Sequence, residues 1–176
     1  INETQPHVYN NLGITLAALA ETPQAEQCYR RAATLDPSFA DPLYNLGLLL
    51  SQTKRFAEAQ PCLEQAIRLQ PQNGRAYEAL SILLRETGDC TGAAAAARQA
   101  VTLSPNSFAA HYQLGQAHMG LSEFAAAAAA YQNAVRLNPN SDVAAIGLGH
   151  AYRGLGRAAD SRAAYRRAVE LNPGNP

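Results

Sequence analysis

The sequence predicts an all-α protein built as a solenoid of helix-turn-helix repeats, and three observations lead to this prediction. A proline recurs every 34 residues along the 176-residue chain, at Pro37, Pro71, Pro105, Pro139 and Pro173. Apolar residues recur at helical spacing before each proline, and no stretch alternates apolar and polar residues as a strand does. One repeat of this length cannot bury its apolar face alone, so the repeats are expected to stack into a single array.

The first helix of each repeat is marked by a small residue that directly follows a leucine, with further apolar residues three or four positions to either side. Asn73, Ser107 and Ser141 stand just before three of these helices. Their side chains can accept a backbone N–H from the first helical turn, so we expect them to be N-caps. The small residues are Gly13, Gly47, Ser81, Gly115 and Gly149.

A short turn and a second helix complete each repeat. Gly88, Ser122 and Gly156 mark the turn, and Thr22 with Pro23 suggests an N-cap followed by proline at the first helical position. The periodic proline then ends the second helix, because it cannot continue a helix and disfavours helical geometry in the residue before it. The expected repeats are residues 6–39, 40–73, 74–107, 108–141 and 142–175.

The small residues of the first helix predict close contact between the two helices of a repeat. Glycine inside a helix costs roughly 0.5–1 kcal/mol relative to alanine, and close approach of a large neighbour would offset that cost. Second helices carry Tyr29, Leu63, Tyr131 and Tyr165 in one column, but Ala97 in repeat three. We therefore expect the alanine-rich second helix of repeat three either to pack closely or to be the loosest point of the array.

Composition narrows the classes of function. The 14 basic and 14 acidic residues balance, which argues against a nucleic-acid partner. No run of 18 apolar residues predicts direct insertion into a membrane. Cys28, Cys62 and Cys90 show neither zinc-site spacing nor an even count for disulfides, which fits a reducing compartment. We expect a cytoplasmic protein, or a periplasmic one if the parent carries a signal, and the sequence is expected to be a fragment of a longer protein.

The residues give no catalytic constellation, so we expect no enzyme, no cofactor and no metal site. His111 and His118 lie seven residues apart, about 10 Å along one helix, which is too far for a shared ion. Both occupy columns filled elsewhere by large residues, so they are expected to point into the packed seam between helices. The glycines around Leu148 and Leu155 do not complete a phosphate-binding motif.

The motif Tyr9…Leu12-Gly13…Leu16…Ala25…Tyr29…Ala32…Pro37 resembles the tetratricopeptide repeat, and the resemblance covers essentially the whole chain. Within that family the sequence is most similar to bacterial arrays and to those of O-GlcNAc-transferase-like proteins. The resemblance implies a right-handed superhelix whose first helices line a concave groove. It also implies that the groove binds a protein or peptide.

By this resemblance the groove residues are those of the first helices that point away from the second helices. Asparagine amides there would hydrogen-bond the backbone of an extended peptide, or alternatively a neighbouring helix, and aromatic and aliphatic side chains would add apolar contact. Met119 and His150 share this face. A carboxylate clamp of the kind found in chaperone-binding members is not expected, because Lys54 is the only lysine. The candidates are Asn10, Asn11, Ile14, Tyr44, Asn45, Leu48, Ile82, Tyr112, Gln113 and Gln116.

The function expected from these observations is that of an adaptor that holds proteins together in a complex. Two alternatives remain open. One is a substrate-recruiting arm of a larger enzyme, similar to O-GlcNAc-transferase-like glycosyltransferases. The other is a scaffold that assembles with itself through the open ends of the array, since a terminal repeat leaves one face uncovered.

Overall fold

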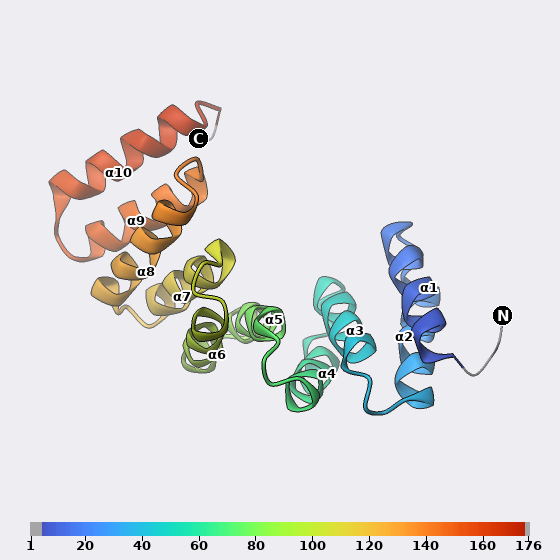
Figure 1. The fold of residues 1–176 in the computed structure, drawn as a ribbon. Helices are drawn as coiled ribbons and strands as arrows, with labels where there is room; N and C mark the ends of the chain where they lie inside the picture. Colours follow the sequence, from blue (N-terminus) through green and yellow to red (C-terminus); the bar gives the residue numbers. More distant parts are fainter. Residues whose placement is uncertain (1–4, 175–176) are drawn as a thin grey trace. The chain divides into compact units, whose positions relative to one another are not determined.

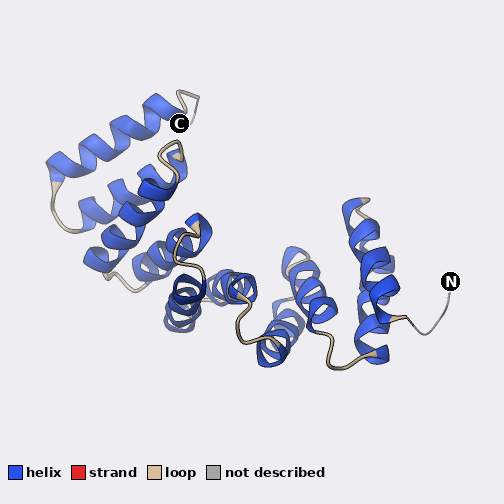
Figure 2. Cartoon of the chain, in the orientation of Figure 1, coloured by secondary structure: helices blue, strands red, loops and turns tan. Residues whose placement is uncertain are grey.

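The computed structural model describes residues 5–174, and within that range every regular element is an α-helix (Figure 1, Figure 2). This confirms the all-α helical repeat fold. The right-handed course and the single array stay predictions. The helices are α1 (Pro6–Ala18), α2 (Thr22–Leu35), α3 (Ala40–Gln52), α4 (Phe56–Leu69), α5 (Gly74–Glu86), α6 (Cys90–Leu103), α7 (Phe108–Gly120), α8 (Phe124–Leu137), α9 (Asp142–Gly154) and α10 (Ala158–Leu171).

The chain forms two compact units, one ending at Leu83 and the other beginning at Leu84. The division lies within α5, in the third repeat. The N-terminal unit contains the hairpins α1–α2 and α3–α4, and α3 packs against α2. The C-terminal unit contains α6 and the hairpins α7–α8 and α9–α10, with α7 packed on α6 and α9 packed on α8. In both units, therefore, a second helix is covered by the first helix of the next repeat.

The expected close contact within each hairpin is confirmed. A Cβ built on Gly13 would lie 2.6 Å from the ring of Tyr29, and one on Gly47 would lie 2.7 Å from the side chain of Leu63. In the C-terminal unit Gly149 faces Tyr165 in the same way, at 2.7 Å. Real Cβ atoms do not approach other atoms this closely, so glycine is needed wherever the facing second helix carries a large side chain.

The polar caps agree with the sequence at three helices and differ at one. Ser107 Oγ accepts a hydrogen bond from the N–H of Ala110, and Ser141 Oγ accepts one from Ala144. Asn73 Oδ1 accepts the N–H of Ala76 at 3.3 Å. The prediction for Thr22 is wrong by one residue, because Thr22 begins α2 and Glu21 precedes it without a side-chain cap.

The turn inside each repeat requires one residue with a positive φ. Gly88 and Ser122 occupy it, with φ of 88° and 58°, as does Gly156. In the first two repeats the position falls to Ala20 and Lys54, both at 60°. Side chains at positive φ carry a steric cost, so these two turns are held by the packing of their helices rather than by local preference.

Candidate functional site

In the N-terminal unit the first helices line a small cleft of about 180 Å³. Three of the predicted groove residues meet there, Ile14 from α1 and Asn45 and Leu48 from α3. Tyr29 of α2 forms part of the wall. Ile14 is 47% exposed, so an apolar side chain is presented to the opening. We call this the N-terminal cleft; it is lined by Ile14, Ala17, Tyr29, Asn45, Leu48, Leu49 and Gln52.

The two asparagines at the base of this region contact each other. Asn45 Nδ2 donates to Asn10 Oδ1 at 2.9 Å, and Asn10 is only 5% exposed. Of the two roles left open for asparagine, the hydrogen bond to a neighbouring helix is the one that Asn45 makes. Asn11 is exposed and does not line the N-terminal cleft. Its carbonyl oxygen accepts a bond from Thr15 Oγ1.

Two further candidates lie outside the N-terminal cleft. Tyr44 is half-buried, and burial raises the pKa of its phenol while the charge of Arg75 opposes that change. The phenol therefore stays protonated and can donate. Ile82 lies on α5 and is 39% exposed. Neither side chain lines the N-terminal cleft, although both belong to first helices.

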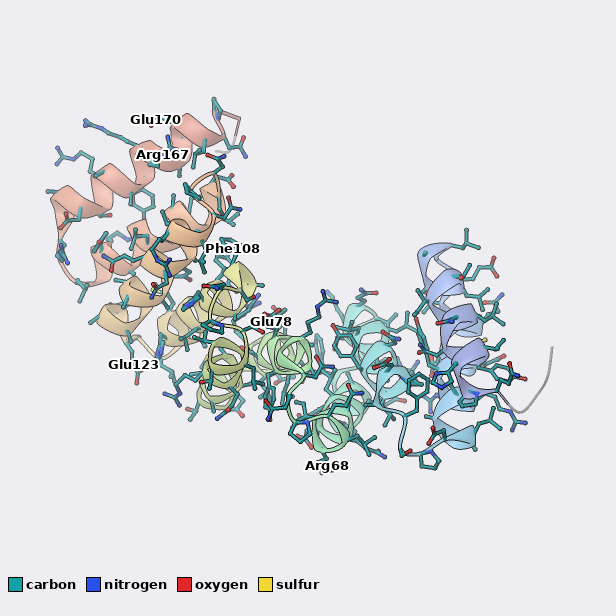
Figure 3. The ribbon with its side chains drawn as sticks, in the orientation of Figure 1. Arg68, Glu78, Phe108, Glu123, Arg167 and Glu170 are labelled. Atoms are coloured by element: carbon teal, nitrogen blue, oxygen red, sulfur yellow. The ribbon has the colours of Figure 1, made fainter. Side chains whose placement is uncertain are left out.

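The C-terminal unit has its own cleft of about 310 Å³. Gln116 is the predicted residue that lines it. Figure 3 labels Phe108 at the start of α7, one helical turn before Tyr112. The rings of Phe108 and Tyr112 stack at 5.8 Å, and Tyr112 Oη accepts a hydrogen bond from Gln116 Nε2 at 2.9 Å. We call this the C-terminal cleft; it is lined by Arg85, Gln116, Met119, Gly120, Tyr131 and His150.

Tyr112 serves mainly as support for the C-terminal cleft. Its ring lies 5.8 Å from that of Tyr131 and packs with Met119 against the buried cluster around Ala127. Gln113, the next candidate, is half-buried, and its Oε1 is buried without a hydrogen-bond partner. The candidates of repeat four are thus brought together by α7, but only Gln116 faces the opening.

The C-terminal cleft combines one permanent cation with neutral side chains. Arg85 donates from Nη2 to Glu86 at 2.6 Å, whereas its Nε is buried with no partner. Burial, and more weakly Tyr112, raises the pKa of Tyr131 well above its usual range, so this phenol is neutral. An unpartnered buried donor beside neutral hydrogen-bonding groups favours a ligand with an acceptor or a negative charge.

His150 is held in its neutral form. Its Nδ1 lies 3.0 Å from Tyr165 Oη and 3.2 Å from Arg153 Nη2. Because Arg153 can only donate, Nδ1 acts as the acceptor and the ring proton sits on Nε2. Burial, and then the charge of Arg153, lowers the pKa of His150 from 6.5. The ring therefore adds a hydrogen-bonding edge to the C-terminal cleft without adding a charge.

Arg85 is the functional candidate that the sequence analysis missed. It stands 34 residues before Met119, so it occupies the same repeat position as a residue already assigned to the groove face. That equivalence was the available signal. Within residues 5–174 no group of three or more His, Cys, Asp or Glu side chains is placed to hold a metal ion. None of the helices in that range combines the length and apolar character needed to cross a membrane.

His111 and His118 lie in the packed seam, as predicted. Each is 8% exposed. His111 Nε2 contacts the carbonyl oxygen of Pro105 at 3.0 Å, and His118 Nδ1 contacts Glu123 Oε2 at 2.6 Å. Each ring therefore ties its first helix to an adjoining loop.

Comparisons with known proteins agree with this architecture. A sequence model of the tetratricopeptide repeat matches residues 10–59, 44–108 and 112–176. No curated protein sequence matches the chain significantly. YrrB, described as a tetratricopeptide protein with an unusual peptide-binding site, is structurally similar, with a TM-score of 0.85 and 22% identity over 99% of this chain and 90% of YrrB.

Two other solved structures are similar at comparable sequence distance. The MamA fragment from Desulfovibrio magneticus RS-1 has a TM-score of 0.89 and 19% identity, covering 99% of this chain and 98% of that one. PilF from Pseudomonas aeruginosa has a TM-score of 0.84 and 22% identity, covering 97% of this chain and 78% of that one. These similarities establish a shared fold.

Proposed function

The chain belongs to the tetratricopeptide repeat family, and we propose that it is an adaptor whose clefts bind an extended or helical segment of a partner protein. The observation that carries the proposal is that both clefts are built at the same repeat positions. Ile14 and Leu48 line one cleft, and Gln116 and His150 stand at the equivalent positions in the other. The repeat thus presents one face of its first helices for binding in each unit.

The two clefts favour different side chains of the partner. The N-terminal cleft has aliphatic walls and suits an apolar side chain, because burying such a group removes apolar surface from water. The C-terminal cleft has Arg85, and it suits a carboxylate or a backbone carbonyl. The peptide-binding site of YrrB and the balanced charge of this chain support a protein partner rather than a nucleic acid. The proposal assigns the chain no catalytic step of its own.

The test begins with a displayed peptide library selected on the full 176-residue chain. Leu48→Glu places a charge in the N-terminal cleft, and Arg85→Gln removes the cation of the C-terminal cleft. For peptides that use the altered cleft we expect affinity to fall about tenfold or more, because a buried contact of roughly 1.4 kcal/mol or more is lost. Binding is measured by fluorescence polarisation.

Matched controls change the same residue types away from the clefts. Leu19→Glu alters a side chain that is 64% exposed, and Arg98→Gln alters an exposed arginine of α6. All four variants are first compared by circular dichroism and melting. Selected peptides that bind Leu48→Glu and Arg85→Gln as tightly as the original chain would overturn the assignment of both clefts.

A further inference from the structure

The outer face of the last hairpin is uncovered in the described part of the chain. A shallow depression of about 690 Å³ runs along it, and Val169 there is 58% exposed. One repeat earlier, Ala128 occupies the position equivalent to Arg162 and is only 5% exposed, on a helix that α9 covers. We call this surface the C-terminal end face; it is formed by Arg153, Ala158, Arg162, Tyr165, Arg166 and Val169.

Helix α1 carries the complementary uncovered surface. Val8 is 36% exposed, whereas the equivalent Ala144 of α9 is fully buried. Thr15 is exposed, whereas the equivalent Leu49 of α3 is 6% exposed. In α3 and α9 these positions lie against the preceding second helix. We call this surface the N-terminal end face; it is formed by Val8, Asn11, Thr15, Ala18 and Glu21.

We propose that the C-terminal end face binds the N-terminal end face of a second copy of this chain. Helix α1 of the second copy would lie on α10, as α3 lies on α2 and α9 lies on α8. Because every repeat is 34 residues long, the internal junctions indicate which residues would meet. This arrangement is head-to-tail, and it goes beyond the binding of a partner segment in the clefts.

The charged pair at the first junction has a reversed counterpart in this arrangement. Glu26 of α2 accepts a hydrogen bond from Arg55 Nη1 at 2.7 Å, and that bond with the nearby Arg30 lowers the pKa of Glu26. Four repeats after Glu26 stands Arg162, and one repeat before Arg55 stands Glu21. An arginine on one copy would therefore meet a glutamate on the other, at the place where a glutamate meets an arginine inside the chain.

Two packing contacts also have counterparts. Tyr29 and Asn45 line the same cleft at the first junction, and Tyr165 would meet Asn11 of the second copy at the equivalent positions. At the last junction the Phe124 ring lies within 2.5 Å of a Cβ built on Gly154. The counterpart there is Ala158 against Ala18 of the second copy. A small residue replaces the phenylalanine where an alanine replaces the glycine, so the pair would fit without a clash.

The charge of the two end repeats is complementary. Residues 142–175 hold 5 basic and 3 acidic residues, a net charge of +2, and residues 6–39 hold 2 basic and 3 acidic residues, a net charge of −1. Opposite net charges favour this orientation over contact between two identical ends.

The intermolecular junction is expected to be weaker than an internal one. The bond between Asn10 and Asn45 has no counterpart, because Ile146 stands at the position equivalent to Asn10. The predicted ion pair is exposed, so salt weakens it. Association should therefore be reversible and should increase with protein concentration.

Sedimentation velocity of the full chain, at protein concentrations from about 5 to 500 µM and low salt, tests this proposal. We expect the average sedimentation coefficient to rise with concentration. Arg162→Glu and Glu21→Arg should each weaken association about tenfold, since an attraction worth up to ~1 kcal/mol becomes a repulsion. The double variant restores the opposite charges and should restore association. Arginine is tolerated at the position of Glu21, since Arg55 and Arg157 occupy it in other repeats.

Arg136→Glu is the matched control, because it makes the same change in net charge at an exposed site of α8 outside both end faces. It should associate like the original chain, and circular dichroism establishes that all variants are folded. A chain that stays monomeric throughout the concentration range overturns the proposal and leaves the C-terminal end face to a different partner. Association that ignores both single variants, that the control abolishes equally, or that the double variant fails to restore also overturns it.

Discussion

Gly115 lies so close to Tyr131 that a Cβ on the glycine would be 2.7 Å from Cε1 of the ring. The same ring is confined on its other side, where a Cβ on Gly147 would be 2.6 Å away. Tyr131 is 3% exposed and cannot turn aside without disturbing α9. The glycine of α7 and the tyrosine of α8 therefore form one packing unit.

The first prediction is that Gly115→Ala destabilises the chain, although alanine is the better helix former. Overpacking of a confined site costs about 1–3 kcal/mol, which exceeds the gain in helix propensity. In the background of Tyr131→Ala, where the ring is absent, the same Gly115→Ala change should instead stabilise by up to ~1 kcal/mol. Denaturant unfolding of the four proteins measures both effects, and a change of the same sign in both backgrounds would contradict this explanation.

The second prediction concerns the bond between Asn45 and Asn10. Asn45→Ala leaves the buried Oδ1 of Asn10 without its donor, and we expect a loss of about 1–3 kcal/mol in the free energy of unfolding. Asn11→Ala changes the same residue type at an exposed equivalent position and should stay within about 0.5 kcal/mol of the original chain. Equal effects of the two variants in denaturant unfolding would show that the bond contributes nothing. Asn45 is accordingly a poor choice for probing the N-terminal cleft.

The third prediction is that His150 titrates below its ordinary pKa of 6.5, as measured by NMR of the ring protons. Arg153→Ala should raise the pKa only in part, because burial is the larger cause. Since the unfolded chain binds this proton more readily, His150 makes the free energy of unfolding decrease as pH falls from 6.5 to the folded pKa. Below the folded pKa this decrease is complete, and above 6.5 it is absent. Arg136→Ala is the control, and a pKa at or above 6.5 would refute the described environment.

Much of the fold could be predicted because each repeat states its structure five times. The small column of the first helix and the large column of the second predicted the contact of Gly149 with Tyr165, since only their juxtaposition explains glycine inside a helix. The caps Ser107 and Ser141 were equally local. Thr22 was misplaced by one residue because helix starts depend on backbone geometry as well as on residue type.

The candidate site was predictable to a smaller extent, because facing a groove and being free to bind are different properties. Ile14, Leu48 and Gln116 line clefts as expected. Asn10 shares their face, yet it is buried in a bond with a neighbouring helix. No pattern in a single sequence distinguishes these cases, since the partner of an asparagine is set by the helix that packs beside it.

The polar bonds between adjacent repeats give the order of the repeats a meaning. Asn10 and Asn45 join repeats one and two, whereas Gln132 donates to Tyr152 between repeats four and five, at 2.7 Å. The contact of glycine with a large side chain, by contrast, lies inside a repeat and would survive any rearrangement of whole repeats. Recombination that shuffled or deleted repeats would thus leave each hairpin intact while mismatching the bonds at the new boundaries. Each repeat is interchangeable as a folding unit and specific as a neighbour.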